Sequence, residues 1–154
     1  CHVIRALLAC SDLQSLLKLN STFCSRLIPG LVRTLSFKRR NAVGDYTVAR
    51  VIDRFKRATS VVLTRCSRIT NASVLVLARL EHIFNLDLST TQVTDVSALG
   101  NCGSLHTLDL MSTRVTDVSA LGSCSSLHAL DLNCTKVTDV SGLGSCSSLH
   151  KLDL

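Results

Sequence analysis

Three chemically active residue types return at one fixed interval in the second half of the sequence. The interval is 22 residues, and it carries the cysteines Cys102, Cys124 and Cys146, the histidines His106, His128 and His150, and the aspartates Asp87, Asp109, Asp131 and Asp153. Thiols and imidazoles are zinc ligands, histidines can sense pH, and neighbouring carboxylates can share a proton in acid–base catalysis. Each of these chemistries requires particular side chains to converge, so the elements that carry them decide which one is available.

The interval belongs to a repeat without gaps that covers residues 86–107, 108–129 and 130–151, and a fourth copy begins at Leu152. Each copy opens with Leu-x-Leu, the alternation of a short strand whose two leucines point to the same side. The apolar residues that follow recur at every third position, which is typical of tight turns or 3₁₀ coil. One copy cannot bury this apolar face alone, so the pattern predicts coils stacked into a solenoid.

Two longer and less regular repeats precede these copies. The strand register extends back through Val61 to Leu35, which predicts six parallel strands starting near residues 35, 61, 86, 108, 130 and 152. Between the first two strands, an amphipathic helix is expected, with Val48, Val51, Ile52 and Phe55 on its apolar side. The sequence stops inside a repeat and does not begin with methionine, so we expect a longer parent protein.

The pattern L-x-L-x-x-T-x-V-T-D-V-x-x-L-x-x-C-x-x-L resembles the leucine-rich-repeat family. It is most similar to the 22-residue repeats of bacterial internalins and of a eukaryotic phosphatase regulatory subunit. The segment VTDVSALGSCSSLH also resembles leucine-rich-repeat proteins of kinetoplastid protists. The resemblance implies an α/β right-handed solenoid in which a curved parallel sheet of about six short strands lines the concave side. It also implies a non-catalytic module that binds a partner protein on that concave strand face.

The first 34 residues form a separate segment in this interpretation, ahead of a solenoid over residues 35–154. Residues 2–28 are expected to be helical, with Ser11 as a helix cap. This stretch resembles the latter part of an F-box, although it lacks the usual opening Leu-Pro and the usual tryptophan. An F-box would dock an adaptor of a ubiquitin ligase and make the repeats a substrate receptor. The alternative is an amphipathic cap that shields the open edge of the first repeat.

The recurring cysteines stand where the repeat rhythm expects a leucine, which favours packing in the core over metal binding. Close pairs such as C-x₂-C, which zinc sites use, are absent from the sequence. Core thiols that form no disulfide indicate a reducing compartment, the cytoplasm or the nucleus. The recurring histidines come directly before each strand, and we interpret them as a solvated stripe along one edge. The sequence therefore predicts neither a metal site nor a cofactor.

Other recurring polar residues are expected to complete the turns between elements. Asp95, Asp117 and Asp139 sit in the V-T-D-V segment just before Ser97, Ser119 and Ser141, a spacing typical of turn caps. Thr91, Thr113 and Thr135 follow the strands, where their hydroxyls are expected to bond exposed backbone groups.

The aspartates between the paired leucines of each strand are the strongest candidates for contact with a partner. Strand alternation directs them away from the core, in a column about 4.8 Å apart on the concave face. Like charges at this spacing raise one another's pKa, and a basic partner or a cation would relieve the repulsion; water and hydrogen bonds are the alternative. The full predicted partner-binding set is Asn85, Asp87, Ser89, Thr107, Asp109, Met111, Ala129, Asp131, Asn133, Lys151 and Asp153.

Charge divides the chain into two unlike halves. Lysine and arginine outnumber aspartate and glutamate by 10 in residues 1–84. In residues 85–154 aspartate and glutamate outnumber lysine and arginine by 4, which gives the chain its net charge of +6. The basic region comprises Lys38, Arg39, Arg40, Arg50, Arg54, Lys56 and Arg57, and it is either a solvated face or a site for nucleic acid or nuclear import. No base-reading motif accompanies it, so nucleic acid is the less favoured partner. No apolar stretch approaches the roughly 20 residues of a membrane span.

Overall fold

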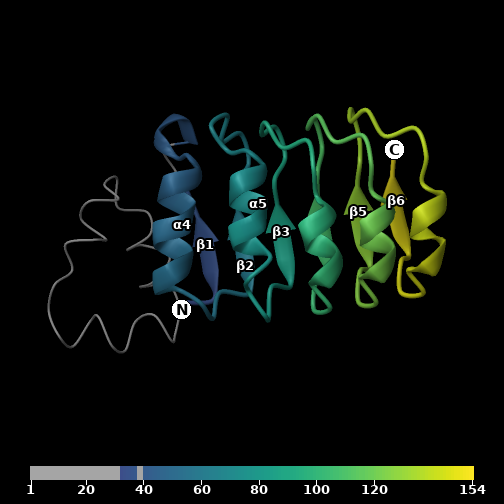
Figure 1. Cartoon of the computed structure of the whole chain (residues 1–154), viewed down its shortest axis with the longest axis horizontal. Coiled ribbons are helices and arrows are strands. Elements are labelled where there is room, and N and C mark those ends of the chain that lie inside the picture. Colours follow the sequence, from purple (N-terminus) through teal and green to yellow (C-terminus); the bar gives the residue numbers. More distant parts are fainter. Residues whose placement is uncertain (1–31, 38–39) are drawn as a thin grey trace, which may run out of the picture.

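The chain forms a solenoid of stacked coils. A computed structural model describes residues 32–37 and 40–154, and in this part six short strands make one parallel sheet. The strands follow one another in chain order along the molecule (Figure 1). They are β1 (Thr34–Ser36), β2 (Ser60–Val62), β3 (Asn85–Asp87), β4 (Thr107–Asp109), β5 (Ala129–Asp131) and β6 (Lys151–Asp153). Each begins one residue before the position that the leucine spacing predicts, and the α/β solenoid is confirmed.

The helical segment predicted at residues 2–28 lies outside the described residues, so the division between residues 34 and 35 stays a prediction. Of the helices that are described, none is long and apolar enough to cross a membrane.

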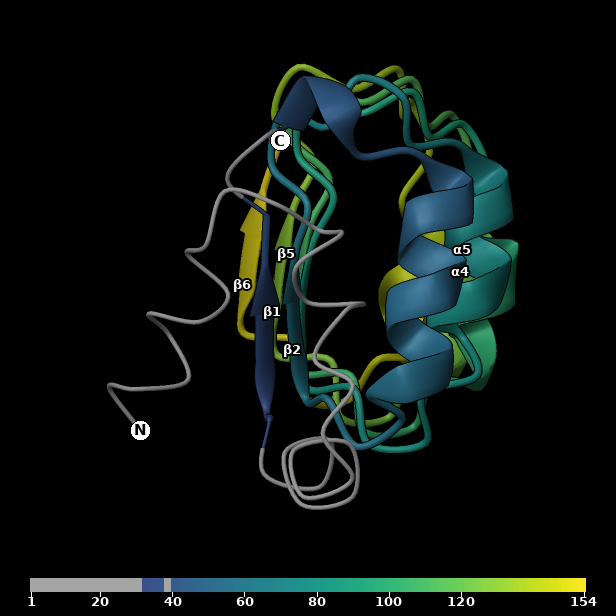
Figure 2. The ribbon, with the colours of Figure 1, turned by 90° about the vertical axis from the view of Figure 1, so that its left-hand side faces the viewer.

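The side of each coil opposite the sheet is helical, as the view along the solenoid shows (Figure 2). The two longer repeats carry α-helices, α4 (Asp45–Arg54) and α5 (Asn71–Leu77), and α4 follows a short 3₁₀ turn, η1 (Arg40–Ala42). The 22-residue repeats carry 3₁₀ helices instead: η2 (Ser97–Asn101), η3 (Ser119–Ser123) and η4 (Ser141–Ser145). Helix α4 confirms the predicted amphipathic helix. The sequence did not reveal α5, because steps of three residues fit a 3₁₀ coil and one side of an α-helix equally well.

The interior is a set of columns in which each coil contributes the same position. Leu86, Leu108 and Leu130 pair in register across the strands, and each is 1% exposed. Cys124 is fully buried, and its thiol donates to the carbonyl of Leu99 in the previous coil at 3.2 Å. Cys102 and Cys146 are buried in the same way, which confirms that the recurring cysteines pack in the core. Burial raises the pKa of the Cys124 thiol to about 11, so the group stays neutral.

Polar side chains complete the turns as the sequence predicts. The hydroxyl of Thr91 donates to the carbonyl of Leu88 at 2.6 Å, and Thr113 and Thr135 repeat this bond one and two coils later. The carboxylate of Asp95 accepts the backbone N–H of Ser97 at 2.8 Å, and Asp117 and Asp139 do the same for Ser119 and Ser141. These local side-chain bonds add to the backbone bonds that join each turn to the next coil, such as that from Ser112 N–H to the carbonyl of Asn133 at 2.8 Å.

Helices η2 and η3 each lie so close to the following 3₁₀ helix that glycine is required at Gly100 and Gly122. A Cβ atom on Gly122 would lie 2.3 Å from the carbonyl oxygen of Gly142 in the following coil. Gly103 differs, because a Cβ there would meet nothing within 4 Å. Serine occupies the equivalent place in the next two repeats, at Ser125 and Ser147.

We expect Gly122→Ala to destabilise the chain by about 1–3 kcal/mol, because the added methyl group forces two coils apart. The matched control, Gly103→Ala, should change the free energy of unfolding by less than about 0.5 kcal/mol. Urea denaturation followed by circular dichroism measures both. Equal stability of the two variants would show that neighbouring 3₁₀ helices are not in tight contact.

Candidate functional site

The outward side chains of the sheet form the candidate site, which we call the strand face. In each strand the middle residue points inward and the two flanking residues point outward. From β3 onward the strand face therefore has two rows: Asn85, Thr107, Ala129 and Lys151, then Asp87, Asp109, Asp131 and Asp153. In β1 and β2 the aspartate position is held by Ser36 and Val62, so the acidic column is confined to the regular repeats.

Three of the four carboxylates in this column, those of Asp87, Asp109 and Asp131, accept the backbone N–H two residues further on. Asp109 accepts the N–H of Met111 at 2.9 Å, and Asp131 accepts that of Asn133 at 2.9 Å. Asp87 accepts the N–H of Ser89 in the same way. Because these bonds fix the orientation of the carboxylates, the column is a rigid array of negative charge along the sheet.

Asp109 lies between Asp87 and Asp131 in the column, and the pKa of its carboxyl group is raised. Burial raises the pKa of its carboxyl group, the hydrogen bond from Met111 lowers it in part, and the charges of Asp87 and Asp131 raise it further. The repulsion predicted from the sequence is therefore present at this residue, but loss of solvent is the larger cause. The ionised form of Asp109 is disfavoured in the folded chain.

One cation in the described part of the chain compensates the column. The ammonium of Lys151 lies 2.8 Å from a carboxylate oxygen of Asp153, and this is the one ion pair between described residues. The positions equivalent to Lys151 in the three preceding strands are the uncharged Asn85, Thr107 and Ala129. Asp87, Asp109 and Asp131 thus have no ion-pair partner among the described residues.

Ser89, Met111 and Asn133 follow the strands and were predicted to contact a partner, and the prediction is wrong for one of them. Ser89 was expected to be open to a partner, but it is 1% exposed and its hydroxyl donates to Asp87. The reason is local: Thr90 takes a left-handed conformation with φ of 56°, and this turn carries the short serine side chain back toward the strand. Met111, at the equivalent position, is 38% exposed because its longer side chain extends past the turn. Asn133 is half-buried and bonds to Asp131.

The histidines form a stacked ladder along the edge where the strands begin. Ring centroids lie 4.8 Å apart between His106 and His128 and 4.4 Å apart between His128 and His150. Phe84 continues the ladder at 4.5 Å from His106, a member that sequence reasoning missed although it also comes directly before a strand. The predicted solvated stripe is therefore partly wrong, since His106 and His128 are half-buried. Parallel rings cannot converge on one ion, and no described cluster of three or more ligand residues could hold a metal.

The predicted basic region is divided by the structure. Lys38 and Arg39 lie outside the described residues. Arg50 donates to the hydroxyl of Tyr46 on the exposed side of α4 at 3.0 Å. Lys56 and Arg57 follow the end of α4, close to a cleft between α4 and α5.

Comparisons with known proteins agree with this geometry. A family model described as leucine-rich repeats in two copies matches residues 103–145. Internalin C2 from Listeria monocytogenes is similar in structure, with a TM-score of 0.68 and 29% identity over 78% of this chain and 50% of that one. A second internalin from the same organism, InlF, has a TM-score of 0.59 and 26% identity over 66% of this chain and 29% of its own.

The leucine-rich-repeat ectodomain of the plant receptor kinase GASSHO1/SCHENGEN3 from Arabidopsis thaliana shares the fold, with a TM-score of 0.63 and 23% identity over 82% of this chain and 16% of that one. No curated protein sequence matches the chain. The chain spans half or less of the length of these three solved structures. Its fold and strand face define a leucine-rich-repeat solenoid. Residues 103–145 match the leucine-rich-repeat family model, and the chain is similar in structure to the internalins.

We expect Asp109→Asn to raise stability at neutral pH, because the folded chain raises the pKa of Asp109 above its ordinary 3.8. Asparagine can still accept the Met111 N–H. The gain in stability over the parent chain should vanish as the pH falls below about 3.8, where the aspartate is itself protonated.

Asp117→Asn should lower stability at neutral pH. The N–H of Ser119 lowers the pKa of Asp117, so its charge stabilises the fold above pH 3.8, and this contribution is lost as the pH falls further.

Thermal unfolding of the two variants and the parent chain between about pH 2 and pH 7 measures these differences. Shifts of the same sign at neutral pH would contradict the opposite environments that we assign to the two aspartates.

Proposed function

We propose that this chain is a non-catalytic module that binds a partner protein on its strand face. Leucine-rich-repeat domains are typically protein-interaction modules, because a stack of repeats offers one long, regular surface. The plant receptor ectodomain that shares this fold was solved in complex with CASPARIAN STRIP INTEGRITY FACTOR 2. Domains of this class are also typically non-enzymatic, and we propose the same for this chain.

The observation that carries the proposal is the acidic column on an otherwise repetitive scaffold. The interior columns keep leucine, valine or cysteine from coil to coil, whereas the outward row before the aspartates reads Asn85, Thr107, Ala129 and Lys151. Variation on one face is where the specificity of a repeat protein resides. Because Asp87, Asp109 and Asp131 lack a cation among the described residues, a partner that brings lysine or arginine would gain more from this face than an acidic one.

The strand face does not test the other predictions. A ubiquitin-ligase role depends on residues 2–28, which lie outside the described residues, and it stays a prediction. Association with nucleic acid through the basic region also stays a prediction. A cytoplasmic or nuclear location remains our proposal, supported by core thiols such as Cys124 and Cys146 that donate to backbone carbonyls.

We expect the double variant Asp109→Asn with Asp131→Asn to weaken binding of the partner at least about tenfold, which corresponds to about 1.4 kcal/mol. Affinity capture with the full-length protein and mass spectrometry first identify the partner, and titration calorimetry then compares the variants. Asparagine keeps the backbone bonds of both residues, so loss of binding reports loss of charge.

The control is Thr116→Lys with Thr138→Lys, which adds the same two units of positive charge on exposed turns away from the strand face. This variant should bind the partner as the parent chain does. If both double variants weaken binding equally, net charge and not the strand face is responsible.

A further inference from the structure

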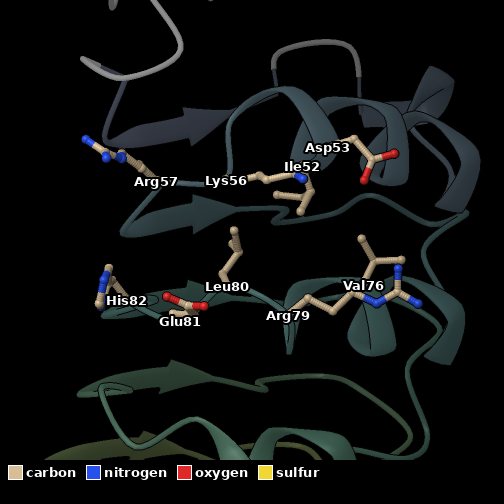
Figure 3. Close-up of a pocket in the computed structure, with 9 residues that line it drawn as sticks. All are labelled: Ile52, Asp53, Lys56, Arg57, Val76, Arg79, Leu80, Glu81 and His82. Carbon is tan, nitrogen blue, oxygen red and sulfur yellow. The ribbon is translucent and has the colours of Figure 1, made fainter.

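A recessed surface lies where α4 and α5 end and the chain turns back toward β2 and β3. It is a cleft of about 500 Å³ between the C-terminal ends of α4 and α5. One wall comes from α4 and the loop after it, the other from α5 and the turn after it (Figure 3). A volume of this size is typical of pockets that hold a small ligand or a few residues of a peptide.

The base of the cleft is apolar. Ile52 and Leu80 form it from opposite walls, and Leu80 points into the gap (Figure 3). Both are almost completely buried, whereas Val76 beside them is half-buried and still presents apolar surface to solvent. The floor thus offers a place for an apolar side chain from outside.

The rim of the cleft is charged and carries more bases than acids. Lys56, Arg57 and Arg79 are exposed cations, and they face two exposed acids, Asp53 and Glu81. None of these five groups forms an ion pair with another described residue. Cations near the ends of helices also offset the helix dipoles, but that role does not require them to surround an opening.

The cations are distributed along the cleft, with Arg57 at one end and Arg79 nearer the other (Figure 3). Lys56 and Arg57 come from the first wall, and His82 lies opposite them on the second wall (Figure 3). The backbone at Arg57 is held by a hydrogen bond from Arg33 to its carbonyl at 3.2 Å. An anionic group in the cleft would meet Lys56 and Arg57 on the first wall and Arg79 on the second.

We propose that this cleft binds an acidic peptide segment of a partner, with one apolar side chain on Val76 and carboxylates against Lys56, Arg57 and Arg79. The peptide is favoured over nucleic acid for two reasons. Asp53 and Glu81 separate the cations of the rim, which suits individual carboxylates of a peptide better than the continuous run of phosphates in nucleic acid. The apolar floor also has nothing to offer a phosphate backbone. The protein would then carry two binding surfaces: the cleft for acidic side chains and the strand face for basic ones.

Fluorescence anisotropy with the full chain tests the proposal. The probe is a labelled peptide with a central leucine flanked on each side by Glu-Asp pairs, and it is compared with its lysine-flanked counterpart and with a single-stranded oligonucleotide of the same charge. We expect saturable binding of the acidic peptide, and at least tenfold weaker binding of both the lysine-flanked peptide and the oligonucleotide. A peptide in which serine replaces the leucine should also bind more weakly.

The decisive variant is Lys56→Glu with Arg79→Glu, which should weaken the acidic peptide at least tenfold. Its matched control, Arg114→Glu with Lys136→Glu, makes the same charge change on exposed turns of the regular repeats and should bind as the parent chain does. Asp109→Asn with Asp131→Asn should also leave this binding intact, which separates the cleft from the strand face. Three results would overturn the proposal: no saturable binding up to about 1 mM peptide, equal loss in both Glu variants, or tighter binding of the oligonucleotide.

Discussion

Burial of a shared apolar interior is the constraint on which the rest of this structure depends. A single 22-residue coil has too little chain to enclose its own leucines, so each coil is stable only against its neighbours. The in-register columns of Leu86, Leu108 and Leu130 satisfy this requirement, and the backbone of one coil bonds the next, as His128 N–H does to the carbonyl of His106 at 2.9 Å. Every outward residue is placed by that register, including those proposed to bind partners.

The same register sets a conflict between stability and binding on the strand face. Burial raises the pKa of the Asp109 carboxyl group, and the charges of Asp87 and Asp131, which the strand spacing brings close, raise it further. The turn aspartates experience the reverse, because backbone N–H groups stabilise their charge and lower the pKa, as at Asp117. A residue type that the repeat retains at a destabilising place is more easily explained by contact with a partner than by the fold.

Repeat length divides the molecule into two chemically different halves. The coils that begin at β1 and β2 are three or four residues longer than the later ones, and this extra chain forms α4 and α5. The later coils form 3₁₀ helices that stack too closely for a Cβ at Gly122. The cleft therefore lies between the two α-helices, in the basic half, whereas the acidic column lies in the half with short repeats.

The sequence by itself determined the strands, their order, the buried cysteines and the outward aspartates, because these follow from a fixed repeat and the two-residue alternation of a strand. Tertiary structure decided the features that depend on contacts between coils or on turn geometry. The burial of Ser89 follows from the left-handed turn at Thr90, and the ladder from Phe84 to His150 requires rings of successive coils to lie within stacking distance. The pairing of Lys151 with Asp153 and the cleft between α4 and α5 likewise arise from distances across the folded chain, which spacing along the sequence does not encode.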